Sequence, residues 1–182
     1  LCVLCACELD LSNNPLVFRY NERAGMPSLV PAFEKEKSSS WAVQQLYEGL
    51  GALDVNNYIS PALADDWKID STATVYTFRL RDAQFHNGKS VTAQDVVYSL
   101  TRLKDPRVAS PGSWVVEGVS ACREIDASTV DIVLQEPNSS FLSLLAMPFC
   151  SIIPSGETAL NSAPVGTGPF KFHVWHYGEK LV

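Results

Sequence analysis

The clearest pattern in the chain is an alternation of apolar and polar residues in short segments. Every second residue is a large apolar one in Val75–Arg81, and the same period runs through Thr129–Leu134. Successive side chains of a strand point to opposite faces of a sheet, so both segments are predicted to be strands with one apolar face. Such a face must cover a hydrophobic core. Similar patterns predict strands at Leu16–Tyr20 and Phe170–Val174.

Other segments carry apolar residues at helical spacing. The serines at 38–40 offer caps for the start of a predicted helix, whose apolar residues Val43, Leu46, Tyr47 and Leu50 recur at helical spacing. A second helix is predicted from Thr92, because Thr92 and Asp95 have the spacing of a capping box, and Asp105-Pro106 ends it. Two shorter helical pieces are expected at Pro61–Trp67 and at Phe141–Met147, the latter ending before a proline.

Strands mixed with helices predict a mixed α/β (α+β) fold. The 182 residues can bury a sizeable core. The formal net charge of -6 provides no broad attraction for a phosphate backbone, so no nucleic-acid partner is expected. Although 46% of the residues are hydrophobic, no uninterrupted apolar run reaches the about 18 residues that cross a bilayer.

Three of the five cysteines crowd the start of the chain, where an apolar run turns polar at Glu8. Leu4-Cys5-Ala6-Cys7 resembles a bacterial lipobox, in which the last cysteine becomes lipidated, and this predicts a signal remnant with Cys7 as the attachment point. A zinc site and a buried first strand are the alternatives. Zinc sites draw four ligands, and no fourth ligand lies nearby in sequence, so no metal site is predicted.

No arrangement for bond chemistry stands out. The Gly-x-Ser-x-Gly turn of many hydrolases is absent, and His86 sits before an Asn87-Gly88 turn, which favours a structural role. On a strand, His173 and His176 would point to opposite faces, so surface positions are expected for both. We therefore expect no enzyme and no cofactor. The charged run at residues 34–37 is, by itself, most simply a solvated loop before a helix.

Several short motifs occur in a fixed order through nearly the whole chain. They are Tyr47-Glu48-Gly49-Leu50, Ala64-x-x-Trp67, Tyr76-Thr77-Phe78-Arg79-Leu80-Arg81, Phe85-His86-Asn87-Gly88, Val91 to Leu100, Asp105-Pro106, Ala109-Ser110-Pro111 and Pro164 to Phe170. In this order they resemble the signature of family 5 of the bacterial extracellular solute-binding proteins, which bind oligopeptides and dipeptides for ABC transporters. Two departures are Val30, where relatives usually carry Asp, and residues 70–74 in place of an Asp-Gly turn.

The resemblance implies a periplasmic-binding-protein type II-like fold, of which this chain would be an N-terminal fragment. Residues 1–15 would be the signal or lipobox remnant and linker. Residues 16–46 and 164–182 would belong to lobe I, and residues 47–163 would form the family-specific subdomain. In the family, two lobes close on a hinge around the ligand, as the periplasmic binding proteins do.

The resemblance also implies the ligand contacts. Peptide-binding relatives pair the ligand backbone with protein backbone after a Leu-x-Pro turn, and this segment falls on Lys35, Glu36 and Lys37, reaching Ser38. An aromatic residue after Ala109-Ser110-Pro111 approaches the pocket in some relatives, and Trp114 is the nearest candidate.

As a function, the resemblance implies a periplasmic or cell-surface receptor that captures peptides and delivers them to ABC transporter permease subunits. A lipid anchor would hold it on a bacterial membrane. Two alternatives stay open: a family member that binds a non-peptide solute such as a nickel chelate or a sugar, and a signalling or adhesion module that uses the same fold without transport.

Overall fold

The structure is a computed structural model, and it describes residues 25–182. The strand expected at Leu16–Tyr20, the segment 1–15 and the predicted lipidation site Cys7 lie outside the described residues. Within them, three α-helices and three 3-10 turns are present. They are η1 (Pro31–Phe33), α1 (Lys37–Leu46), α2 (Ala93–Lys104), η2 (Ser113–Val116), α3 (Phe141–Leu145) and η3 (Pro148–Cys150).

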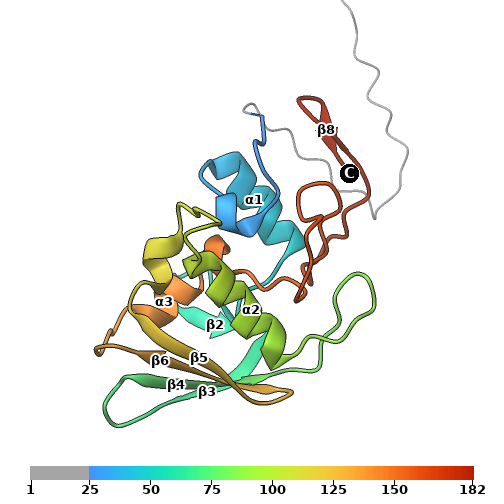
Figure 1. Cartoon of the computed structure of the whole chain (residues 1–182). Coiled ribbons are helices and arrows are strands. Elements are labelled where there is room, and N and C mark those ends of the chain that lie inside the picture. The colour runs from blue at the N-terminus through green and yellow to red at the C-terminus, as the bar shows by residue number, and fades with distance from the viewer. Residues whose placement is uncertain (1–24) are drawn as a thin grey trace, which may run out of the picture.

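A four-stranded antiparallel sheet with the order β3-β4-β6-β5 lies at one end of the molecule (Figure 1). Two smaller ribbons accompany it, one beside the sheet and one near the C-terminus. The strands are β1 (Gly51–Leu53), β2 (Ile59–Pro61), β3 (Ala64–Ile69), β4 (Val75–Leu80), β5 (Val119–Asp126), β6 (Thr129–Leu134), β7 (Trp175–His176) and β8 (Lys180–Leu181). The two small ribbons pair β1 with β2 and β7 with β8.

The alternating pattern is confirmed in β4 and β6, which lie next to each other in the sheet. Tyr76 and Phe78 of β4 are buried, as are Val130 and Ile132 of β6. Helix α2 crosses this apolar face (Figure 1) and packs on it through a stripe that includes Val96. The main hydrophobic core therefore lies between the sheet and α2.

The capping box at the start of α2 is also confirmed. The Asp95 carboxylate accepts hydrogen bonds from the backbone N–H and the hydroxyl of Thr92, at 2.8 and 2.9 Å. It accepts a further one from the N–H of Ser155 at 2.7 Å, and the N–H of Ile153 donates to the Ser99 hydroxyl at 3.0 Å. One polar edge of α2 thus fixes both its own start and the extended segment that runs beside it.

Three predictions of local structure are wrong, two of them in the first half of the chain. Pro61–Trp67 is not a helical turn, because β3 begins at Ala64 and pairs antiparallel with β4. Apolar residues at positions i and i+4 occur both in a helical turn and in a short edge strand, so this spacing alone does not distinguish the two. Here the pairing with β4 makes the segment a strand. The predicted serine caps are also displaced: α1 begins at Lys37 with Glu36 at its N-cap, so the serines lie in its first turn.

The strand expected at Phe170–Val174 is likewise not observed. Only β7 and β8 pair in this region, and the N–H groups of His173 and Val174 both donate to the carbonyl of Val182. Alternation marks a segment that can be a strand, but a strand also needs a neighbour along its length, and here the backbone bonds to Val182 reach only His173 and Val174, at the end of the segment. Phe141–Met147 is confirmed as helical, from Phe141 to Leu145. His173 and His176 are exposed, as expected.

Residues 164–169 close against the C-terminal end of α1 by backbone contact. The N–H of Gly168 donates to the carbonyl of Leu46 at 3.0 Å. His86 joins the same junction: its N–H donates to the carbonyl of Gly166 at 2.8 Å, and its Nε2 lies 2.9 Å from the carbonyl oxygen of Gly168. The structural role predicted for His86 is confirmed, and it connects the turn after β4 to the segment near the C-terminus.

This junction requires glycine. A Cβ at position 166 would lie 2.0 Å from the carbonyl oxygen of Leu46, and one at 168 would lie 2.5 Å from that of Gln45. Backbone atoms cannot yield as flexible side chains do, so Gly166→Ala or Gly168→Ala is expected to lower the free energy of unfolding by about 3 kcal/mol. Gly118→Ala is the control, because nothing lies within 4 Å of its added Cβ. Chemical denaturation would measure all three, and equal stability of the three variants would contradict the assignment.

Candidate ligand-binding site

The chain is extended for a short stretch between η1 and α1. Glu34 and Glu36 have extended backbone angles, and the side chains of Lys35, Glu36 and Lys37 are exposed. Within residues 25–182, the backbone N–H groups of Lys35 and Glu36 donate to no other group. Exposed, extended backbone with unused donors is what strand addition by a peptide requires.

The predicted contacts at Lys37 and Ser38 lie in a different environment. Both residues are in the first turn of α1, and Ser38 is buried, with its hydroxyl donating to the carbonyl of Gly25 at 3.1 Å. The extended backbone is therefore limited to residues 34–36. We keep the name pairing segment for Lys35–Ser38, the residues predicted from the sequence.

The loop between α2 and β5 approaches the pairing segment. We call residues 105–116 the α2 loop; Figure 1 shows its yellow-green trace rising beside the blue turn η1. The Ser110 hydroxyl donates to the carbonyl of Ala32 at 2.5 Å across 78 residues of sequence, and the N–H of Gly112 donates to the Ser110 hydroxyl. Trp114 lies in the same loop, within η2, with 52% of its surface exposed.

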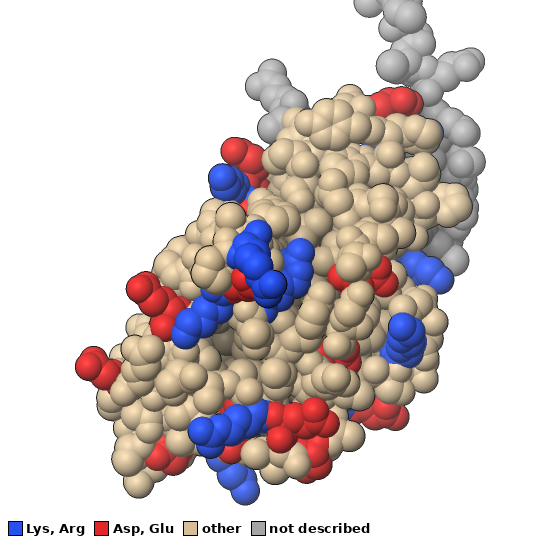
Figure 2. All heavy atoms as spheres, in the orientation of Figure 1, with Lys and Arg blue, Asp and Glu red and all other residues tan. Residues whose placement is uncertain are grey.

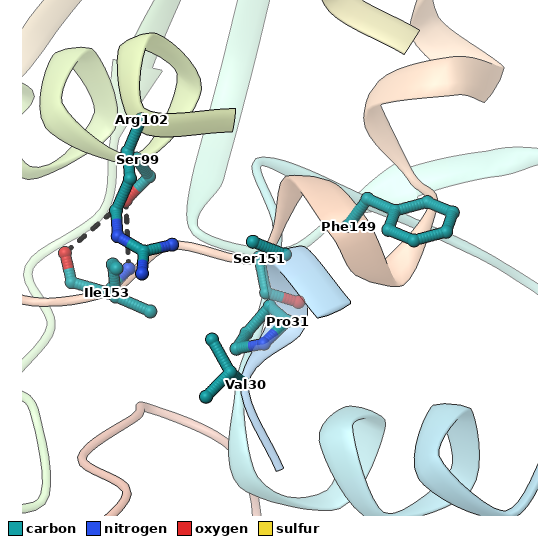
Figure 3. A pocket seen from close by; sticks show the side chains of 8 residues that line it. Val30, Pro31, Ser99, Arg102, Phe149, Ser151 and Ile153 are labelled. Atoms are coloured by element: carbon teal, nitrogen blue, oxygen red, sulfur yellow. Dashed lines mark hydrogen bonds between the residues drawn. The ribbon is translucent and has the colours of Figure 1, made fainter. Parts of the chain in front are cut away.

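A small cavity lies beneath η1, where η1, α2 and η3 meet. Its volume, measured as the space open to the centre of a water molecule, is about 10 Å³, which is enough for roughly one water molecule. Figure 3 shows Arg102 reaching from α2 toward Ser151 and Pro31 across this space. The Nη1 atom of Arg102 is buried and has no hydrogen-bond partner among the described residues.

A second, larger hollow opens near the C-terminus. It is lined by Thr158, Ala159, Asn161 and Ser162 and by the segment from Phe172 to Trp175. Asn161 borders it, and the Asn161 side-chain oxygen accepts a hydrogen bond from the N–H of Leu29 at 3.2 Å. The chain that leads into η1 is thus held at Leu29 by Asn161 and at Ala32 by Ser110.

Charged side chains of both signs lie side by side over much of the face in Figure 2, most of them away from the end that carries β7 and β8. Among the described residues, no group of three or more His, Cys, Asp or Glu side chains could hold a metal ion. In the same part of the chain, Cys122 and Cys150 are free thiols, and burial raises the pKa of each to about 12, so neither is a thiolate nucleophile at neutral pH. No helix in the described residues is long and apolar enough to cross a membrane.

Sequence reasoning missed two features of this site. Glu34 belongs to the run interpreted as a solvated loop, yet it is only 8% exposed, and burial, followed by the nearby charge of Glu36, raises its pKa. In the sequence, Ser110 belongs only to the motif Ala109-Ser110-Pro111. Its contact with Ala32 joins residues that are far apart in sequence, so no local pattern could have indicated it.

Comparison with known proteins identifies the class. The model of the family "Bacterial extracellular solute-binding proteins, family 5 Middle" matches residues 58–182. Di/tripeptide-binding protein 2 of Pseudomonas aeruginosa is 36% identical to this chain. The aligned region covers 70% of this chain and 29% of the length of that protein. The periplasmic oligopeptide-binding protein OppA of Salmonella typhimurium is 31% identical over 89% of this chain and 34% of its own.

A solved structure gives the same result for the fold. The periplasmic binding protein AgaA from Agrobacterium tumefaciens R10, in complex with agropinic acid, superposes with a TM-score of 0.81 at 31% identity, over 85% of this chain and 33% of that one. The fold is that of the periplasmic binding proteins. The chain belongs to family 5 of the bacterial extracellular solute-binding proteins, and it spans about a third of the length of these relatives.

Glu34 provides a test of the site by pH. Because its pKa is raised in the folded protein, the ionised carboxylate destabilises the fold above that pKa, and stability increases as the pH falls toward 4.5, the ordinary glutamate value. Glu34→Gln is expected to stabilise the protein at pH 7, where the parent carboxylate is ionised, and the difference is expected to vanish below pH 4.5.

The matched control is Glu136→Gln, at an exposed position. Thermal unfolding of both variants and the parent protein from pH 4 to pH 8 would measure the effect. A Glu34→Gln curve parallel to the parent curve at every pH would contradict a buried, ionisable Glu34.

Proposed function

We propose that the full-length protein is the solute receptor of an ABC importer and that it captures dipeptides or oligopeptides outside the cytoplasmic membrane. The observation that carries this proposal is the exposed backbone at Lys35 and Glu36, whose N–H groups donate to no group of the described residues. The names of two relatives, a di/tripeptide-binding protein and an oligopeptide-binding protein, support peptides as the ligand class.

In this proposal the ligand pairs its backbone with the pairing segment, so recognition depends little on the ligand's side chains. Lys35 and Glu36 contribute mainly through backbone groups, while Lys37 and Ser38 border them in the first turn of α1. Trp114 offers an exposed aromatic face to the ligand from the α2 loop. A second lobe in the full-length protein closes over the ligand, excludes water and strengthens these polar contacts.

The remaining parts of the proposal concern the setting. The protein acts as a receptor and performs no bond chemistry, its partners are the permease subunits of the importer, and its compartment is the periplasm or the cell surface. Cys7 is the proposed point of lipid attachment, supported by the lipobox-like sequence before it. Residues 47–163 are the proposed subdomain, and residues 16–46 and 164–182 are the proposed parts of lobe I.

A second candidate is a non-peptide solute. It is favoured by the complex of AgaA with agropinic acid, because this protein of the same fold and 31% identity holds a ligand that is named as an acid and not as a peptide. Backbone pairing discriminates between the candidates, since it needs a ligand with its own regularly spaced N–H and C=O groups.

Calorimetry on the full-length protein tests the ligand class. Alanine peptides of two to five residues are the probe, because they offer backbone groups with little side chain. We expect heat of binding and 1:1 stoichiometry for at least one length. Absence of binding to every alanine peptide and to a mixed pool of short peptides, together with binding of agropinic acid or another small solute, would overturn the peptide assignment.

Substitution at Lys35 tests the pairing segment itself. Lys35→Pro removes the N–H that the ligand would use, and the extended backbone of Glu34 suits the residue before a proline. The affinity for the tightest-binding alanine peptide is expected to fall about tenfold, because a ligand carbonyl loses its donor.

Lys35→Ala keeps the N–H and is the control, with an expected change of less than about twofold, because pairing does not read the side chain. Equal losses in both variants would instead indicate that the ligand contacts the lysine side chain.

A further inference from the structure

Ser110 is buried in the α2 loop, although it belongs to a connection between secondary-structure elements. It is 6% exposed, and it follows Ala109, whose positive φ of 51° marks a sharp change in chain direction. The Ser110 hydroxyl donates to the carbonyl of Ala32 and accepts the N–H of Gly112 at 3.1 Å. A buried hydroxyl with both roles in use is fixed in position.

Ala32 is the middle residue of η1, three residues before Lys35. The turn closes on itself through two backbone bonds, from Phe33 to Val30 and from Glu34 to Pro31, at 3.0 and 3.2 Å. These bonds set the shape of the turn but do not attach it to the rest of the protein. That attachment requires contacts from outside η1.

Two polar contacts from distant parts of the described chain provide it. Asn161 holds Leu29, just before the turn, and Ser110 holds Ala32, within the turn. Beneath the turn lies the cavity with the Nη1 atom of Arg102, which donates no hydrogen bond to the turn or to any other described residue. Of these two contacts with the turn, the bond from Ser110 is the nearer in sequence to Lys35.

We propose that Ser110 is a positioning residue for ligand capture: it sets the place of the pairing segment relative to Trp114. Both elements depend on the same loop, because Trp114 lies four residues after Ser110. One hydroxyl thus joins the backbone that pairs with the ligand to the aromatic side chain that covers it. This inference rests on the proposed function, and it assigns part of the geometry of the site to the α2 loop.

The test uses the full-length protein and the same alanine peptides of two to five residues. Ser110→Ala removes the bond to Ala32 and is expected to weaken the tightest peptide about tenfold. Ser110→Cys keeps nearly the same side-chain shape with a weaker donor. Its peptide affinity is expected to lie between the affinities of the parent protein and the alanine variant. It is also the milder change should Ser110→Ala fail to fold.

Ser99→Ala is the matched control. Ser99 is buried, borders the same cavity, and bonds α2 to Ile153 instead of to η1 (Figure 3). The Ser99→Ala variant is expected to lose about as much stability as Ser110→Ala while keeping the parent protein's affinity for the peptide. If Ser99→Ala and Ser110→Ala lose affinity in proportion to stability, the role of Ser110 is merely structural and the inference is overturned.

Hydrogen exchange separates this inference from the proposed function. In free Ser110→Ala protein, the amides of Phe33 and Glu34 are expected to exchange at least about tenfold faster, while those in the middle of α2 are unchanged. Parent protein that binds no peptide would overturn the proposed function and leave this readout in place. Parent protein that binds peptide, with unchanged affinity and exchange in Ser110→Ala, would overturn the inference alone.

Discussion

The apolar face of the four-stranded sheet must be covered, and the position of helix α2 follows from this constraint. Tyr76, Phe78, Val130 and Ile132 bury their side chains on one side of β4 and β6, and α2 packs across them. Because α2 is held there, the loop that follows it leaves at a fixed place and direction. That loop brings Ser110 to Ala32 and carries Trp114. The geometry of the candidate site therefore derives from hydrophobic packing elsewhere in the molecule.

The sequence predicted best those elements whose structure is determined by their own residues. The alternation in β4 and β6 and the capping box of Thr92 and Asp95 are local patterns, and each was confirmed. β3 was missed because it is an edge strand with exposed Asp65, Asp66 and Lys68, so its pattern contains little apolar alternation. The opposite error occurred at Phe170–Val174, where a strand was predicted from the alternation. Among the described residues, this segment is not part of a strand, because β7, which pairs with β8, begins only at Trp175.

The candidate site was less accessible to sequence reasoning. The pairing segment was placed by resemblance to a family, since the charged run 34–37 by itself indicated a solvated loop. The burial of Glu34 could not be predicted, because the run places one charged residue on the inner side of the chain just where η1 ends. The bond from Ser110 to Ala32 spans 78 residues, and its existence depends on how two separate elements pack. Local patterns contain no information about such a contact.

Backbone groups supply much of the polar contact between the parts of this structure. His86 meets the carbonyls of Gly166 and Gly168, Gly168 meets the carbonyl of Leu46, and Ser110 meets that of Ala32. Every residue has a backbone carbonyl, whatever its side chain. Such contacts therefore restrict only the identity of the donor residue and of the glycines that allow the backbones to approach closely. This is consistent with a TM-score of 0.81 at only 31% identity to AgaA. Backbone pairing with a peptide would extend the same physical principle from the interior of the protein to its ligand.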